Sequence, residues 1–275
     1  MKKGWISYPY IFWMILFTLV PLILVLYYSL TATDPSGVTV FTAENFRTFM
    51  QPIYMKVLMR SVILALASTL ICLLLGYPVA MILSGRDLSH RNLMVLLFII
   101  PMWMNFLLRT YAWMTILDRK GVINSLLGMA GLPQLNILYT DAAVILGMVY
   151  NFLPFMVLPI FSVLSKIDRS VVEAAEDLGS DSFTVFRRII FPLSLPGVVS
   201  GITMVFMPAV TTFIISKLLG GSQYMLIGNL IEDQFTRVYD WNFGSAVSIV
   251  MMLLILVSMG VMSRYDKEEM GGGLL

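Results

Sequence analysis

The sequence predicts an all-α membrane protein that crosses a lipid bilayer six times. Of its 275 residues, 59% are hydrophobic and only 12% are charged, whereas a soluble domain carries about 25% charged residues. So much apolar surface cannot be buried inside one globule, and lipid is the solvent that suits it. The apolar residues fall in separate runs with short connections, so we expect one transmembrane domain over residues 1–275.

Six apolar runs reach the length of about 20 residues that a membrane-spanning helix needs. The first run is longer than the apolar core of a signal peptide, about 7–15 residues, and ends without a small-residue cleavage site, so we expect it to be retained. Arg109 interrupts the third run. The predicted spans cover residues 8–30, 61–83, 93–117, 143–164, 194–219 and 244–262.

The placement of lysine and arginine predicts how these spans are oriented. With the N-terminus in the cytoplasm, ten basic residues fall in cytoplasmic segments and six fall in outer segments. This bias and the even number of spans predict a multi-pass protein of the cell membrane with both termini in the cytoplasm. The same orientation places the longest polar connection, residues 166–193, in the cytoplasm.

Several kinds of chemistry are excluded by composition. Cys72 is the only cysteine and His90 the only histidine, which removes disulfide bonds, Cys-x-x-Cys metal sites and His-dependent catalytic triads. Asp168, Glu176 and Asp177 cluster without such partners, so a solvated helix face explains them better than a membrane enzyme does. No basic run suggests nucleic acid, and no G-x4-G-K-[ST] phosphate loop occurs, so any ATP hydrolysis must reside on another chain.

The connection 166–193 begins with a predicted helix that has clear start and stop signals. Ser170 and Glu173 have the spacing of a capping box, in which each side chain accepts a hydrogen bond from a first-turn amide. Gly179 follows the last apolar residue of this helix, where a left-handed residue ends many helices. The segment therefore predicts a short helix that ends in a glycine turn.

A second short helix is predicted directly after that turn. Ser180 or Asp181 can cap its start, and Phe183 and Ile190 belong to a set of apolar residues at helical spacing. Pro192 is expected to end this helix before the fifth span begins. The connection is thus expected to be an ordered helix–turn–helix rather than a flexible loop.

The residues of this connection resemble the EAA loop of bacterial ABC-importer permeases, whose consensus is E-A-A-x3-G-x9-I-x-L-P. Only Phe191 departs from it, where leucine is usual. The resemblance implies the type I ABC-importer permease fold and a coupling loop that docks on a separate nucleotide-binding ATPase subunit. That partner would bind ATP and Mg²⁺, and this chain would need no cofactor. The implied coupling residues are Glu173, Ala174, Ala175, Gly179, Phe183, Ile189 and Pro192.

A secondary carrier driven by an ion gradient is the alternative from another class. Such carriers place ionisable residues inside their spans as relays or ion ligands. None of the six predicted spans contains Asp or Glu, and only Arg109 and Lys217 lie within them or at their ends. This absence argues against proton coupling and leaves the roles of Arg109 and Lys217 open.

Over nearly its full length the chain is similar to the spermidine/putrescine permease group within that family. The resemblance implies import of polyamines together with a second permease in a heterodimer, ATPase subunits and an extracytoplasmic polyamine-binding protein. Permeases for other small solutes share parts of the pattern, so another cargo stays open. The similarity rests on residues 73–78, 100–103, 109–113, 208–209, 218–221 and 226–231.

A polyamine is a flexible polycation, so its pathway should offer aromatic faces and negative charge. Residues 220–242 hold three carboxylates against one arginine. Taken singly, each ring is better explained by an aromatic belt at the membrane interface. The missing intramembrane carboxylate would have to come from a partner. Lys217 either repels early entry or extends its charge to the interface. The candidate pathway residues are Trp103, Tyr111, Trp113, Glu232, Asp233, Asp240 and Trp241.

Overall fold

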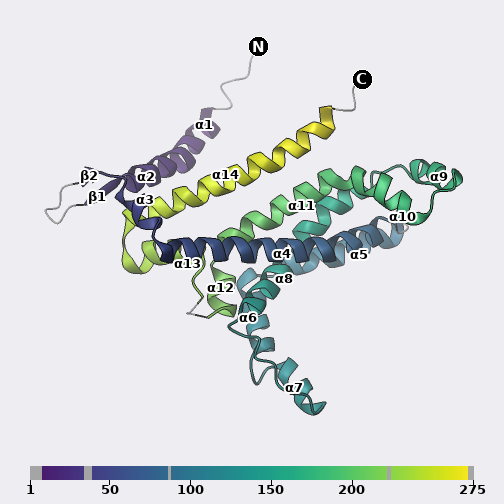
Figure 1. Ribbon diagram of the computed structural model, residues 1–275, viewed down its shortest axis with the longest axis horizontal. Helices are drawn as coiled ribbons and strands as arrows, with labels where there is room; N and C mark the ends of the chain where they lie inside the picture. The colour runs from purple at the N-terminus through teal and green to yellow at the C-terminus, as the bar shows by residue number, and fades with distance from the viewer. Residues whose placement is uncertain (1–7, 34–38, 86–87, 222–223, 272–275) are drawn as a thin grey trace. The chain divides into compact units, whose positions relative to one another are not determined.

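The computed structural model describes residues 8–33, 39–85, 88–221 and 224–271, and most of them are helical (Figure 1). The chain forms two compact units: Met1–Met59 with Ile227–Val257, and Arg60–Leu226 with Ser258–Leu275. Residues 1–7 and 272–275, the termini predicted to be cytoplasmic, lie outside the described residues, as does the side chain of His90.

In the first unit, Asn242 at the start of the last helix contacts the N-terminal segment. The Asn242 amide donates hydrogen bonds to the carbonyl oxygens of Tyr28 at 3.1 Å and Thr31 at 2.6 Å. The elements are α1 (Tyr8–Met14), η2 (Ile15–Leu19), α2 (Val20–Ser29), antiparallel β1 (Thr31–Thr33) and β2 (Thr39–Phe41), α3 (Glu44–Phe49), the start of α4 (Pro52–Ser84), α13 (Ile227–Asp233), η4 (Gln234–Val238) and most of α14 (Trp241–Gly271).

The second unit is centred on two helices, α8 and α11, that approach closely because glycine lies between them. A Cβ atom at Gly197 would lie 2.9 Å from the Pro159 carbonyl oxygen, and one at Gly201 would lie 2.8 Å from the Met156 sulfur. This unit contains α4 from Arg60 onward and the end of α14. Its other elements are α5 (Leu88–Trp103), α6 (Phe106–Leu117), α7 (Val122–Met129), α8 (Asp141–Leu164), α9 (Arg169–Asp177), α10 (Ser182–Val185), η3 (Phe186–Ile190), α11 (Phe191–Thr211) and α12 (Ile214–Leu219).

The fold class predicted from the sequence is confirmed. Among the described residues, five helices are long and apolar enough to cross a membrane, and a bent pair of helices brings the number to six. The five are Tyr8–Ser29, Pro52–Ser84, Asp141–Leu164, Ser182–Thr211 and Trp241–Met262, and the bent pair is Leu93–Trp103 with Phe106–Met129.

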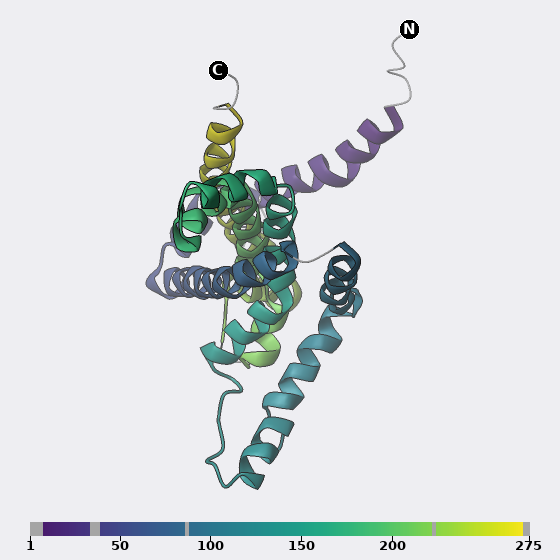
Figure 2. The ribbon, with the colours of Figure 1, turned by 90° about the vertical axis from the view of Figure 1, so that its right-hand side faces the viewer.

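The predicted span 93–117 is not one continuous helix. The chain turns by 89° between α5 and α6, and Figure 2 shows this change of direction. Pro101 lies in the last turn of α5, where it removes a backbone donor. The Asn105 side chain then accepts hydrogen bonds from the amides of Leu107 and Leu108, so it caps a new helix.

Two further helix ends differ from the expected ones. The run expected over 194–219 is interrupted after Thr211, because Thr212 takes an extended conformation before α12. Pro192 does not end the second loop helix, since Ser182–Thr211 is one helical run. Within it, Phe186–Ile190 is a π-helical turn, and the Phe191 amide donates to the Phe186 carbonyl. Pro192 lies just after this π-helical turn, at the start of α11.

Candidate functional site

The first helix of the 166–193 loop is capped by a residue other than the predicted one. The Asp168 carboxylate accepts a hydrogen bond from the Ser170 amide at 3.0 Å and is the N-cap of α9. The predicted capping box is therefore wrong, because the helix begins two residues earlier than Ser170 would allow. The same hydrogen bond favours the ionised carboxylate and lowers the pKa of Asp168.

The glycine turn that follows α9 has the predicted left-handed conformation. Gly179 has a φ of +83°, which an L-residue adopts only at a cost. The amides of Gly179 and Ser180 donate to the carbonyl oxygens of Glu176 at 2.9 Å and Ala175 at 3.1 Å. These bonds satisfy the last carbonyls of α9. A Cβ atom added at Gly179 would meet no other atom of the described residues within 4 Å.

The second helix starts at Asp181, one of the two predicted caps. Its carboxylate accepts hydrogen bonds from the amides of Phe183 at 3.2 Å and Thr184 at 3.4 Å, and from the Thr184 hydroxyl at 2.6 Å. The bond from that hydroxyl is the main cause of a lowered pKa for Asp181. Both loop helices therefore begin at an ionised aspartate.

The loop presents a largely open surface. Leu178 is 88% exposed and Phe183 is 68% exposed, whereas Val185 is only 2% exposed and packs inward. Exposed apolar side chains therefore lie beside charged ones on this loop. Of the predicted coupling residues, Glu173, Ala174, Gly179 and Phe183 are exposed, and Ala175, Ile189 and Pro192 are half-buried.

The inner end of the loop is fixed to α4 by a contact that the sequence did not suggest. The Tyr77 hydroxyl lies 2.8 Å from the Ser194 hydroxyl, and its ring packs edge-on against Phe186 with centroids 5.8 Å apart. Tyr77 belongs to α4, Phe186 to η3 and Ser194 to α11. These contacts join the end of the loop to two long helices of the same unit.

Three predicted pathway residues belong to the second unit. Trp103 is 79% exposed beside the break between α5 and α6, and Tyr111 is 47% exposed. Trp113 packs edge-on against Tyr150 of α8, with ring centroids 5.3 Å apart. Arg109 is only 8% exposed; its Nε atom has no hydrogen-bond partner within the described part of the chain, and its guanidinium carbon lies 6.0 Å from the Phe106 ring centroid.

The other predicted pathway residues belong to the first unit, and most of them have structural partners there. Asp240 accepts a hydrogen bond from the Phe243 amide at 2.9 Å at the start of α14. Asp233 pairs with Arg237 at 3.3 Å. Trp241 packs edge-on against Phe235 at 5.7 Å. Glu232 is half-buried.

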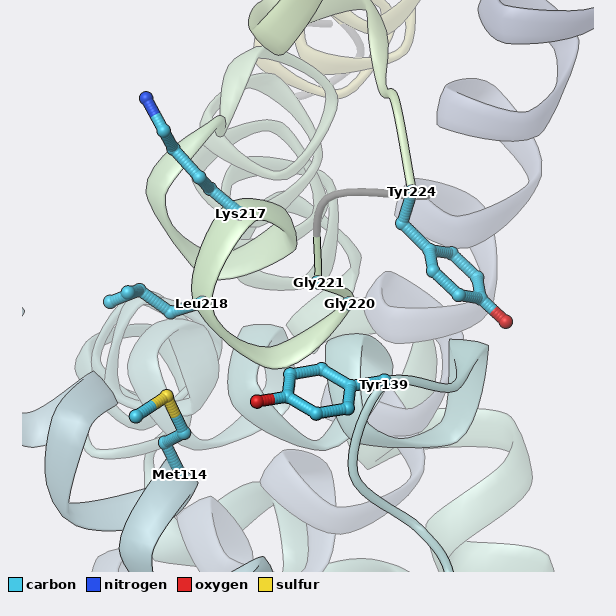
Figure 3. Close-up of a pocket in the computed structure, with 7 residues that line it drawn as sticks. All are labelled: Met114, Tyr139, Lys217, Leu218, Gly220, Gly221 and Tyr224. Carbon is cyan, nitrogen blue, oxygen red and sulfur yellow. The ribbon is translucent and has the colours of Figure 1, made fainter.

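A cavity of about 510 Å³ lies in the second unit, lined by Met114, Tyr139, Lys217, Leu218, Gly220, Gly221 and Tyr224 (Figure 3). The Tyr139 amide donates to the Leu219 carbonyl oxygen at 2.8 Å. Gly221 has a φ of +74°, and a Cβ there would lie 2.8 Å from Cδ1 of Tyr139. The turn after α12 is therefore packed directly on the Tyr139 ring.

Beside this cavity, Arg60 of α4 bridges two partners that sequence reasoning missed. Its Nη2 atom lies 2.8 Å from Asp141 Oδ1 at the start of α8, and its guanidinium carbon lies 4.1 Å from the centroid of the Tyr224 ring. The ion pair joins residues 81 positions apart in the sequence. Helical periodicity cannot predict a contact over such a separation.

Comparison with known proteins assigns this arrangement to a family. A relative from Haemophilus influenzae, the spermidine/putrescine transport system permease protein PotB, is 40% identical over 260 residues, which cover 93% of this chain and 91% of that protein. PotB of Escherichia coli K12 is 42% identical over 253 residues, covering 89% of this chain and 92% of that protein.

A similar fold occurs in the crystal structure of a bacterial ABC transporter that imports the acidic polysaccharide alginate. The two chains share 17% identity and a TM-score of 0.79, with 96% of each covered. The model of the family "Binding-protein-dependent transport system inner membrane component" matches residues 76–268. This match spans more than half of the chain, which therefore belongs to that family of multi-pass inner membrane proteins.

Proposed function

We propose that this chain is the permease subunit of an ATP-driven importer whose cargo is a polyamine such as spermidine or putrescine. The observation that carries the importer function is the loop 166–193, an ordered helix–turn–helix with exposed Leu178 and Phe183 on its surface. The cargo assignment is supported by the two relatives named as spermidine/putrescine permeases, which are similar along nearly their whole length.

In this proposal the chain is the non-catalytic membrane component and crosses the bilayer six times, at about residues 8–30, 61–83, 93–117, 143–164, 194–219 and 244–262. Both termini and the loop 166–193 face the cytoplasm. The excess of basic residues in the corresponding segments supports this orientation.

The loop docks on an ATPase subunit through its exposed residues, and a second, similar permease completes a heterodimer. A polyamine-binding protein delivers the cargo at the outer face. The family description names binding-protein dependence, which supports the last of these partners. ATP-driven closure of the ATPase subunits moves α9 and α10, and the contact between Tyr77 and Ser194 passes that movement to α4 and α11.

Polyamine passes residues that offer rings and carboxylates. Trp103 and Tyr111 have exposed rings in the second unit, and Trp113 lies one turn further along α6 than Arg109. In the first unit Glu232, Asp233, Asp240 and Trp241 supply negative charge and an aromatic face. A cation is attracted to both kinds of group, which suits a flexible chain of ammonium groups separated by methylenes.

The coupling role is tested by ATP-dependent spermidine uptake in proteoliposomes that contain the assembled transporter and its binding protein. Gly179→Val is expected to abolish uptake, because valine cannot adopt the left-handed turn that orients the two loop helices. Gly131→Val is the matched control, since Gly131 also has a positive φ, +70°, and open space around it. Uptake that survives Gly179→Val would remove the docking role.

The cargo is tested separately by equilibrium binding to the binding protein that works with this permease. Spermidine or putrescine is expected to bind and to be taken up by the assembly. Capture of an anion or a sugar instead would make the polyamine assignment wrong and leave the permease assignment intact.

A further inference from the structure

The side chain of Arg60 occupies a position that has the chemistry of an ammonium-binding site. Its guanidinium meets the Asp141 carboxylate at 2.8 Å, with a second contact from Nε at 3.3 Å. The opposite partner is the face of the Tyr224 ring, 4.1 Å from the guanidinium carbon. An alkylammonium group also binds favourably to a carboxylate and an aromatic face.

We propose that Arg60 is a resident cation in a polyamine subsite formed by Asp141 and Tyr224, and that an ammonium group of the cargo displaces it during entry. This inference rests on the proposed function, because it assumes that the cargo is a polyamine. It adds the position at which the permease first binds that cargo. Arg60 then serves as an internal competitor that fills the subsite when no cargo is present.

Exchange of one cation for another is feasible at this position. The side chains of Arg60 and Asp141 are 38% and 49% exposed, so solvent reaches both partners. Ion pairs exposed to this degree contribute little net stability. A cargo ammonium can therefore replace the guanidinium without breaking a buried contact.

The neighbouring cavity gives the rest of the cargo a place to lie. Tyr224 both stacks on Arg60 and lines the cavity of about 510 Å³, together with Tyr139. In Figure 3 the Lys217 ammonium points away from both tyrosine rings, so the aromatic side of the cavity is not directly opposed by that charge. A methylene chain can lie along these rings while one terminal ammonium replaces the guanidinium of Arg60.

The test is equilibrium binding of radiolabelled spermidine to the purified assembled transporter without its binding protein, at fixed ionic strength. An internal competitor lowers apparent affinity by the fraction of time that the site is open. If Arg60 fills the subsite about nine-tenths of the time, Arg60→Gln raises the apparent affinity about tenfold. Adding Asp141→Asn to Arg60→Gln is expected to abolish this gain.

Arg47→Gln is the control, because it removes an exposed arginine of α3 for which neither a subsite nor a pathway role is proposed. It is expected to leave spermidine affinity unchanged. If the transporter with Arg60→Gln does not assemble, Arg60→Lys is the second variant. Lysine replaces the two hydrogen bonds from Nε and Nη2 with a contact from one ammonium group and leaves the subsite more readily, so we expect a smaller rise in spermidine affinity.

A different result is expected if the ion pair of Arg60 with Asp141 only stabilises the packing of α4 against α8. Arg60→Gln would then lower the melting temperature and leave spermidine affinity equal to that of the wild type or weaker, and this outcome overturns the proposal. Wild-type uptake of spermidine is measured in parallel. If the wild type takes up spermidine but Arg60→Gln shows no rise in spermidine affinity, only the subsite is rejected. If the wild type takes up no spermidine, the polyamine function itself is rejected.

Discussion

Two turns of the second unit use glycine in the same backbone conformation but for different reasons. Gly179 has a φ of +83° in the loop 166–193, and Gly221 has a φ of +74° beside the cavity. A Cβ atom at Gly179 would meet open space, whereas one at Gly221 would lie 2.8 Å from the Tyr139 ring. The loop requires glycine for its direction alone, while the turn at Gly221 also requires it for space.

The contacts that order these two regions also differ: they are local in the loop and distant in sequence at the turn. The loop is held by short-range aspartate caps at Asp168 and Asp181 on an exposed surface. The turn at Gly221 is held by contacts distant in sequence, such as the hydrogen bond from the Tyr139 amide to the Leu219 carbonyl. The loop is therefore ordered although its apolar side chains Leu178 and Phe183 are exposed, whereas the turn at Gly221 is packed against other parts of the chain.

The largest expected effect on stability separates the two glycine turns. Gly221→Ala combines the left-handed strain of about 1–2 kcal/mol with overpacking against Tyr139, which costs about 1–3 kcal/mol more. We expect its loss of unfolding free energy to be about 2–5 kcal/mol in thermal or denaturant unfolding. Gly179→Ala, which has the same sign of φ without the crowding, should lose only the strain. Equal losses would mean that the turn is not tightly packed.

A smaller effect is expected on association with the ATPase subunit, and it compares two neighbours in the loop. Phe183→Ala removes a 68% exposed ring and should weaken binding about 30-fold, the size of an interface hot spot, without changing the melting temperature. Val185→Ala removes a side chain that is 2% exposed and should instead destabilise the chain by about 1–2 kcal/mol. Titration of purified subunits measures both, and the comparison fails if the two variants behave alike.

The sequence predicted the features that depend on short spacing. Apolar runs of sufficient length identified a polytopic helical protein, and the interval from Glu173 to Pro192 identified the loop. Gly179 was placed correctly and the second cap was narrowed to Ser180 or Asp181, because a helix stop and a helix start are local signals. Asp168 displaced Ser170 as the cap since both are good N-cap residues, and spacing alone does not choose between them.

Features formed between distant segments were missed. The bend at Asn105 depends on a cap inside an apolar run, where periodicity predicts continuity. The ion pair of Arg60 with Asp141 joins residues 81 positions apart, and Tyr224 is brought to it from a third segment. Neither charge lies in a motif, so only the packing of α4, α8 and the turn after α12 brings them together.

The smallest expected effect concerns the pH dependence of the loop. The lowered pKa of Asp181 means that its ionised form stabilises the second loop helix. This contribution is complete above the ordinary pKa of the carboxyl group and is lost as the pH falls through the lowered value in the folded protein. Protection of the Phe183 and Thr184 amides against hydrogen exchange, corrected for the intrinsic rate at each pH, should therefore fall in acid.

Two substitutions at Asp181 separate the charge from the hydrogen bond. Asp181→Ala should reduce protection of these amides about fivefold at neutral pH and remove its dependence on pH. Asp181→Asn should keep most of the protection, because an amide oxygen also caps a helix, yet show no loss in acid. Wild-type protection that stays constant across this pH range would show that the loop is ordered by something other than its aspartate cap.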